Sequence, residues 1–493
     1  MTRIKEFLAT FLKLAARSKL AMTGGVMALL IFPVLATVVL LDWQGWLDNP
    51  YLNFLFYLVL GPLFVAGIVM VVTGLLFFRG QEEIGLFAYE YVKEQLNMPG
   101  RFTRIRRLFY LMSLLTVLLL LLIAITAFSG FRYTDSVQFC AQFCHTVMEP
   151  EYVTYQNSSH SRVSCVECHI GAGTEWFTRA KLTGIKQFLA VLTDSYSRPI
   201  PTPITGLRPD RATCEQCHRP EKFHGHKLYF IDKFLPDRKN SHLQTVMIMK
   251  VGSGGYLGQN AQGVHWHISD RFQVRYTPAD QGLHEITRVV LEERDGGRIT
   301  FVPASTGKKA PAADGEVGEE RLMDCMDCHN RPTHVFLSPE RALDRKLLTR
   351  RIPDELPFIK RQALEAITAD YATTQEAMHE ISRKIKNWYQ DNYPDPAKER
   401  NDLLAAAIRG AQEAYRENVF PDMNITWNFY RDFIGHQEGT GCFRCHDGSF
   451  VAEQGSRTIS HQCDTCHIIL AEDQPVEMVL RLMHAWPQQA GIP

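Results

Sequence analysis

The twelve cysteines form six pairs, and a histidine directly follows the second cysteine of every pair. Five pairs have the spacing C-x-x-C-H, and the first pair has one more residue, C-x-x-x-C-H. The cysteines are Cys140 and Cys144, Cys165 and Cys168, Cys214 and Cys217, Cys325 and Cys328, Cys442 and Cys445, and Cys463 and Cys466, followed by His145, His169, His218, His329, His446 and His467. C-x-x-C-H is the attachment motif of c-type haem, because two thiols reach the two vinyl groups of one porphyrin while the next imidazole binds the iron. The sequence therefore predicts six covalently attached haem c groups.

Two other uses of paired cysteines are a zinc ribbon and a disulfide framework. Zinc chemistry gives no reason for a histidine after every second cysteine. Histidine accounts for 18 of 493 residues, so six such coincidences would have odds of about 10⁻⁹ to 10⁻⁸ on composition. The same arithmetic argues against disulfides.

The second axial ligand of each iron separates electron transfer from catalysis, since an iron with two protein ligands has no position open for a substrate. With six of the 18 histidines in the motifs, twelve remain, which is enough for every haem. The candidates are His160, His224, His226, His265, His267, His334, His436 and His461. Any one of them could instead be a surface or hydrogen-bonded histidine, but most members of the set are expected to be ligands. Met148, four residues after Cys144, is either a ligand of the first haem that would raise its potential or a packing residue.

Three long uncharged segments precede the motifs, at residues 20–41, 49–78 and 108–131. At about 1.5 Å per residue, each is long enough to cross a hydrocarbon core of about 30 Å, and we predict transmembrane helices at 20–41, 54–78 and 108–131. The first segment is too long for a signal peptide and lacks a small-residue cleavage site. Lysine and arginine cluster before the first segment and after the second, which predicts a cytoplasmic amino terminus and a carboxy-terminal part outside the cytoplasm.

The rest of the chain is predicted to be mainly α, a haem-packed domain of helices and loops with a small β insertion. We expect a membrane anchor at 1–131, haems one to three at 132–235, the β-rich insertion at 236–320, the fourth haem with a helical scaffold at 321–430, and a di-haem segment at 431–493. Strands are predicted at 246–251, 272–276, 286–292 and 298–302, and helices at 174–194, 362–392 and 397–417. Lysine plus arginine equals aspartate plus glutamate at 53 each, so nothing in the charge balance indicates a nucleic acid partner.

The sequence around the first three motifs resembles that of the NapC/NirT family of membrane-anchored multihaem cytochromes c. The runs are FCAQFCHTVMEP at 139–150, NSSHSRVSCVECHIGAG at 157–173 and LRPDRATCEQCHRPEKF at 207–223. The resemblance implies a quinol dehydrogenase of the bacterial inner membrane, with a periplasmic haem domain, that takes electrons from menaquinol or ubiquinol. In size and layout the chain is similar to the larger quinol-oxidising cytochromes of metal-reducing, extracellular-respiring bacteria.

A quinol gives two electrons and two protons, whereas one haem accepts one electron, so the leading hypothesis needs a quinol site beside one haem. The candidates are Lys181, Lys186 and Asp194, in or after an amphipathic segment whose lysines could instead face phosphates of the lipid bilayer. Electrons would leave from haems five and six to a soluble periplasmic multihaem cytochrome or reductase. The alternatives are a terminal reductase of a small nitrogen or sulfur oxyanion, with one five-coordinate haem, and a docking or relay anchor for a periplasmic reductase.

Overall fold

The computed structural model describes most of the chain in two units. The described residues are 18–43, 50–77, single positions from 103 to 125, 128–143, 145–171, 173–204, 208–219, 222–252, 262–269, 271–294, 296–304, 318–394, 400–437 and 439–489. The first unit comprises residues 1–136 and 173–175, and the second comprises 137–172 and 176–493.

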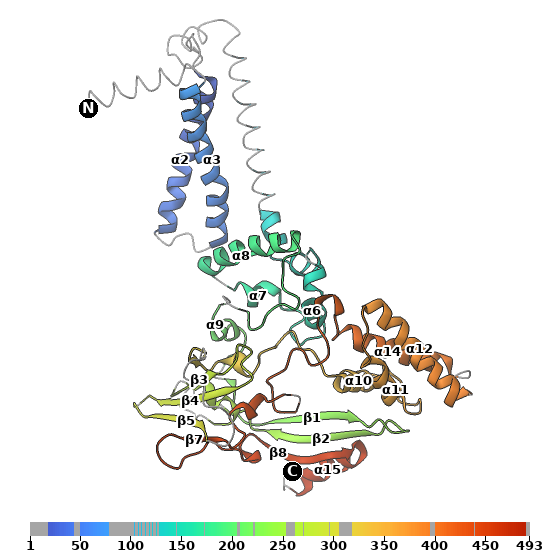
Figure 1. The fold of residues 1–493 in the computed structure, drawn as a ribbon. Helices are drawn as coiled ribbons and strands as arrows, with labels where there is room; N and C mark the ends of the chain where they lie inside the picture. The colour runs from blue at the N-terminus through green and yellow to red at the C-terminus, as the bar shows by residue number, and fades with distance from the viewer. Residues whose placement is uncertain are drawn as a thin grey trace. The chain divides into compact units, whose positions relative to one another are not determined.

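The first unit contains two apolar helices, α2 (Lys19–Trp43) and α3 (Pro50–Phe77) (Figure 1). Within α2, Leu20–Val39 is long and apolar enough to cross a membrane, which confirms an apolar helix at the first predicted span. In α3, the shorter segment Val59–Gly74 is the described apolar part. The third predicted span, 108–131, lies largely outside the described residues, so the three-helix anchor stays a prediction.

Small residues allow α2 and α3 to approach closely. A Cβ added at Gly24 would lie 2.5 Å from the carbonyl oxygen of Gly67, and one added at Gly74 would lie 2.4 Å from the amide nitrogen of Ala21. Ala21 is fully buried and Ser18 is 2% exposed. Glycine and alanine at a helix contact let two backbones pack against each other without side chains between them.

Two antiparallel sheets form part of the second unit. One has the order β1 (Lys227–Phe234), β2 (His242–Met249), β8 (His467–Pro475). The other has the order β6 (Arg321–Leu322), β3 (Phe272–Pro278), β4 (Ile286–Glu293), β5 (Arg298–Pro303), β7 (Phe450–Ala452). The four predicted strands correspond to β2, β3, β4 and β5. The prediction missed β1 and β8, which are largely exposed and lack a clear alternation of apolar residues, and the short β6 and β7.

Four helices enclose the largest apolar core, namely α10 (Pro339–Leu348), α11 (Ile359–Ile367), α12 (Thr374–Asn392) and α14 (Asn401–Arg416). The single helix predicted at 362–392 is wrong, because the chain leaves the helix after Ile367. Thr373 then caps α12, since its hydroxyl accepts a hydrogen bond from the Glu376 amide at 3.1 Å.

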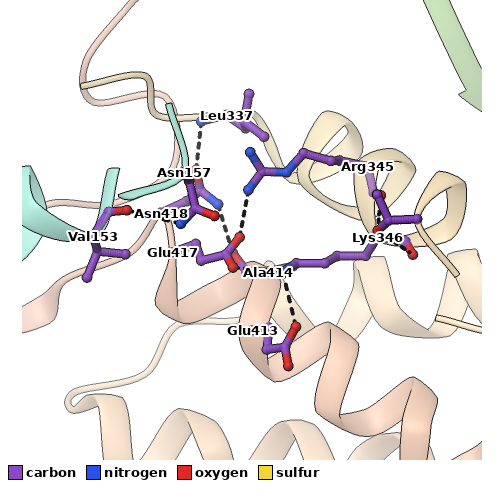
Figure 2. A network of polar contacts seen from close by, with 10 residues as sticks. Val153, Asn157, Leu337, Arg345, Lys346, Glu413, Ala414, Glu417 and Asn418 are labelled. Carbon is purple, nitrogen blue, oxygen red and sulfur yellow. Dashed lines mark hydrogen bonds and ion pairs between the residues drawn. The ribbon is translucent and has the colours of Figure 1, made fainter. Parts of the chain in front are cut away.

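Charged side chains join α10 to α14 at the edge of this core (Figure 2). Lys346, with 8% of its side chain exposed, lies 2.7 Å from Glu417 and 3.2 Å from Glu413. Arg345 reaches the other oxygen of Glu417 at 2.7 Å. The amide side chain of Asn418 accepts a hydrogen bond from the Leu337 backbone at 2.7 Å. These bonds fix the segment that follows the fourth cysteine motif on the helical scaffold.

The cysteine motifs lie on short helical segments. These are the π-helix Gln138–Phe143, α7 (Cys165–His169), α9 (Asp210–Cys214), and 3-10 turns at Cys325–Asp327, Gly441–Arg444 and Cys463–Thr465. Between them are α6 (His145–Gln156), α8 (Thr174–Leu192) and the 3-10 turn Val264–Ile268, and α15 (Val476–Gln489) follows β8. The helix predicted at 174–194 is thereby confirmed as α8.

Candidate haem-binding sites

The second to fifth motifs each form about one helical turn, whereas in the sixth the turn covers Cys463–Thr465 and His467 begins β8. In the third, fourth and fifth motifs, the histidine amide donates to the carbonyl of the first cysteine, with N···O distances of 2.8, 2.8 and 3.0 Å. Residues three and four apart lie on the same side of a helical turn, so both thiols and the imidazole project together. The π-helix Gln138–Phe143 contains Cys140 and the three residues after it, and its wider turn suits the additional residue of the first motif. Cys144 and the side chain of His145 lie outside the described residues.

Consecutive motifs lie next to each other in space. The neighbouring Cys140 thiol lowers the pKa of Cys165 to about 7, and the neighbouring Cys325 thiol lowers the pKa of Cys214, so motif one lies near motif two and motif three near motif four. The eleven described cysteines form no disulfide with one another.

The remaining neighbours are close enough to act on each other electrostatically. Desolvation raises the pKa of Cys168, Cys328 and Cys466, and the nearby Cys214 adds to the rise at Cys168 while Cys442 adds to it at the other two. These electrostatic effects place motif two near three, four near five, and five near six. The six motifs therefore follow one another through the unit in the order of the sequence.

Four motif histidines face a second histidine from outside the motifs. The ring centroids are 6.3 Å apart for His169 and His334, 5.9 Å for His218 and His160, 5.8 Å for His446 and His267, and 6.1 Å for His467 and His436. Two imidazoles that bind one metal from opposite sides, with metal–nitrogen bonds of about 2.0 to 2.1 Å, have centroids roughly 6 Å apart. The spacing of all four pairs fits a haem iron between the rings.

Hydrogen bonds orient several of these imidazoles. The Nδ1 atom of His160 lies 3.1 Å from the Pro332 carbonyl, and that of His267 lies 2.9 Å from the Val264 carbonyl. His334 Nδ1 lies 2.9 Å from the Glu151 carbonyl. A carbonyl only accepts, so Nδ1 carries the proton and Nε2 keeps the lone pair that a metal needs. This is the orienting contact that metal-binding histidines commonly make.

Burial keeps three candidate ligands in the neutral, metal-binding form. It lowers the pKa of His334 to about 4, and it lowers the pKa of His265 and His267. His265 lies within electrostatic range of His329 in the fourth motif, which lowers its pKa further. The ring of His265 also packs on Phe223, with centroids 4.7 Å apart.

The other candidate ligands are not brought to a motif histidine within the described residues. His224, His226 and His461 are exposed. Met148 is half-buried on α6, and the side chain of His145, its expected partner, lies outside the described part. The ligands of the first haem therefore stay a prediction.

The three candidates for a quinol site lie on and just beyond α8. This helix exposes the apolar side chains of Leu182, Ile185, Phe188, Leu189 and Leu192. Lys181 is half-buried, and its positions four before Ile185 and seven before Phe188 place it on that apolar face. Lys186 is exposed and lies about 100° further around the helix than Ile185. Asp194 is exposed and forms an ion pair with Arg198 at 2.5 Å, a partner that the sequence did not reveal.

Polar residues near the motifs were also missed from sequence. The Glu151 carboxylate lies 3.1 Å from His334 Nδ1, and the Arg331 guanidinium lies 3.6 Å from the ring centroid of Tyr430. Arg444 and Asp327 are buried inside motifs five and four. The sequence did contain a sign of these two residues, because each is a charged residue between the two cysteines of a motif.

Known proteins similar in sequence to this chain are cytochromes c. Residues 103–199 match the family model described as the NapC/NirT cytochrome c family, N-terminal region. The chain is 35% identical over 455 residues to cytochrome c-type protein ImcH of Geobacter sulfurreducens, which covers 92% of this chain and 88% of the relative. It is 35% identical over 79 residues to cytochrome c-type protein NrfH of Wolinella succinogenes, which covers 15% of this chain and 44% of that protein. No solved structure shows significant similarity. The chain therefore belongs to the NapC/NirT cytochrome c family, whose members are membrane-anchored multihaem electron-transfer proteins with covalently bound haem c.

Proposed function

We propose that this protein is a quinol dehydrogenase of the bacterial inner membrane that passes electrons through six haem c groups to a periplasmic acceptor protein. The observation that carries the proposal is the pairing of four motif histidines with a second histidine at 5.8 to 6.3 Å. An iron with two histidine ligands exchanges electrons but leaves no position for a substrate. This argues for a conductor rather than a terminal oxyanion reductase.

Haem supplies one-electron redox chemistry when bound, and the residues of the chain hold it in place. The six cysteine pairs would form the thioether bonds. His334, His160, His267 and His436 would complete the haems of motifs two, three, five and six, and His265 the haem of motif four. His145, with Met148 as its candidate partner, would bind the first. The sequential contacts between motifs support a path in chain order that ends at haems five and six.

The quinol would enter at α8, whose exposed apolar face suits the lipid interface. Lys181, on that face, would donate a hydrogen bond to a quinol oxygen. The exposed Asp194 carboxylate would take protons to solvent, and Lys186 would bind lipid phosphates. A cytoplasmic amino terminus, three spans and a periplasmic haem part complete this arrangement, together with the domain boundaries expected from the sequence. The acceptor would be a soluble multihaem cytochrome or reductase that docks weakly.

A direct test is to add a menaquinol or ubiquinol analogue to the full-length protein in detergent and follow the haem absorbance. We expect quinol alone to reduce the haems and intact-mass analysis to show six of them. If a reductase partner is required for any reduction, the protein is a relay anchor. If cyanide binds a high-spin haem in motifs two to six, the terminal reductase is supported.

A further inference from the structure

Arg444 is a buried cation inside the fifth cysteine motif, between Cys442 and Cys445. Only 7% of the residue is exposed. Its guanidinium donates to the carbonyls of Gly441 at 3.0 Å and Leu283 at 2.9 Å, and to the carbonyl of Asp327. The ring centroid of Phe433 lies 4.1 Å from its central carbon. The side chain is thus held from several directions.

The bond to Asp327 joins motif five to motif four. Asp327 stands between Cys325 and Cys328 and is 3% exposed. Its carboxylate accepts from the Tyr276 hydroxyl and, at 2.6 Å, from the Asp324 amide. Within the described residues, no carboxylate forms an ion pair with Arg444, whose bonds go to neutral carbonyls. Its positive charge is therefore not cancelled by direct contact.

This charge lies beside the cysteines of both motifs. Arg444 stands between Cys442 and Cys445, and its guanidinium donates to the carbonyl of Asp327, which stands between Cys325 and Cys328. Groups attached to these sulfurs lie in the same electrostatic field.

We propose that Arg444 is a positioning residue that holds motifs four and five together and raises the reduction potentials of the two haems attached there. The inference rests on the proposed series of haems. Ferric haem carries one more positive charge than ferrous haem, so a nearby fixed cation favours the reduced form. Arginine stays protonated at any pH at which the protein is folded. Electrons from the earlier haems are thereby drawn toward haems four and five.

The experiment is a spectropotentiometric titration of the full-length protein in detergent, with haem content checked by intact mass. In Arg444→Gln, we expect two of the six one-electron components to move to lower potential. A unit charge at roughly 10 Å, with an effective dielectric constant near 20, changes each reduction equilibrium by about tenfold, which is about 59 mV for one electron. Arg444→Lys keeps the charge and should leave the potentials in place. Arg457→Gln removes an exposed arginine of the same segment and is the matched control.

Unchanged potentials in Arg444→Gln with a full haem complement would overturn the inference. So would an equal downward shift in Arg444→Lys, since that would show an effect of packing alone. If Arg444→Gln is recovered without haem, the potentials of Arg444→Lys provide the test. Unchanged potentials support the inference, and lower potentials overturn it. Quinol is absent from this titration. A wild-type protein that quinol fails to reduce would therefore refute the proposed function and leave the result for Arg444 standing.

Discussion

His334 provides the sharpest test of the histidine pairing. Its ring centroid lies 6.3 Å from that of His169, and its Nδ1 donates to the Glu151 carbonyl at 2.9 Å. His334→Ala removes one of the two imidazoles proposed to bind the second iron. With five haems untouched, we expect about one sixth of the haem to change from low-spin to high-spin.

The measurement is electron paramagnetic resonance of the oxidised, full-length variant, integrated against total haem. The new high-spin fraction should also bind cyanide, which an iron with two protein ligands excludes. His226→Ala is the matched control, because His226 is exposed and faces no motif histidine within the described residues. It should leave the spectrum unchanged.

Two results would contradict the assignment. An entirely low-spin His334→Ala would show that another residue binds the second iron, and a high-spin signal in His226→Ala would show that exposure is a poor guide to ligation. Loss of the second haem from His334→Ala is distinguished by intact mass. That outcome would place His334 in the scaffold of the site instead.

Three further changes test the entry site, the scaffold and the anchor. Lys181→Met should slow haem reduction by quinol about tenfold or more with haem content unchanged, whereas Lys186→Met should leave the rate within about twofold; equal effects would place the quinol elsewhere. The Lys360 side chain is 4% exposed and lies 2.5 Å from Asp344, so Lys360→Met leaves a buried carboxylate without its partner. We expect urea unfolding to show a free energy of unfolding lower by about 3–5 kcal/mol, and the double variant with Asp344→Asn to recover part of that loss. Gly74→Leu should separate α2 from α3, because no side chain fits beside Ala21; thermal unfolding in detergent should show a lower midpoint than for Gly61→Leu, where the added Cβ meets nothing within 4 Å.

The cysteine motifs could be identified from the sequence, while the histidines that face them could not. Attachment of haem through two thioethers requires a fixed local spacing, so the motif of Cys165, Cys168 and His169 can be recognised within five consecutive residues. The imidazole facing His169 belongs to His334, which is far along the chain. No local sequence pattern indicates that these two residues lie close together. Eight histidines and one methionine were candidate second ligands in the sequence, but only the fold distinguishes His334, which faces a motif histidine, from the exposed His226.

The same distinction between local and distant contacts holds for the fold. The amphipathic period of α8 and the β-branched runs of β3 to β5 were sufficient to predict these elements. The pairing of β7 with β5, and of β8 with β2, joins segments distant in sequence. β7 has only three residues, and the largely exposed β8 lacks a clear alternation of apolar residues. The break between α11 and α12 is marked by the cap at Thr373, where α12 begins, and a continuous helical period conceals it.

The histidine pairs also constrain how the sites can be assembled. The partner of the second motif, His334, follows the fourth motif, while the partner of the third, His160, precedes the second. His267, which faces the fifth motif, lies between the third and the fourth. If each pair binds one iron, the haems cross-link segments from the whole length of the second unit, and no motif-by-motif division of the chain leaves complete sites. The second haem would then take its second ligand from the fourth-motif region, so these two parts of the unit must fold together before that haem is complete.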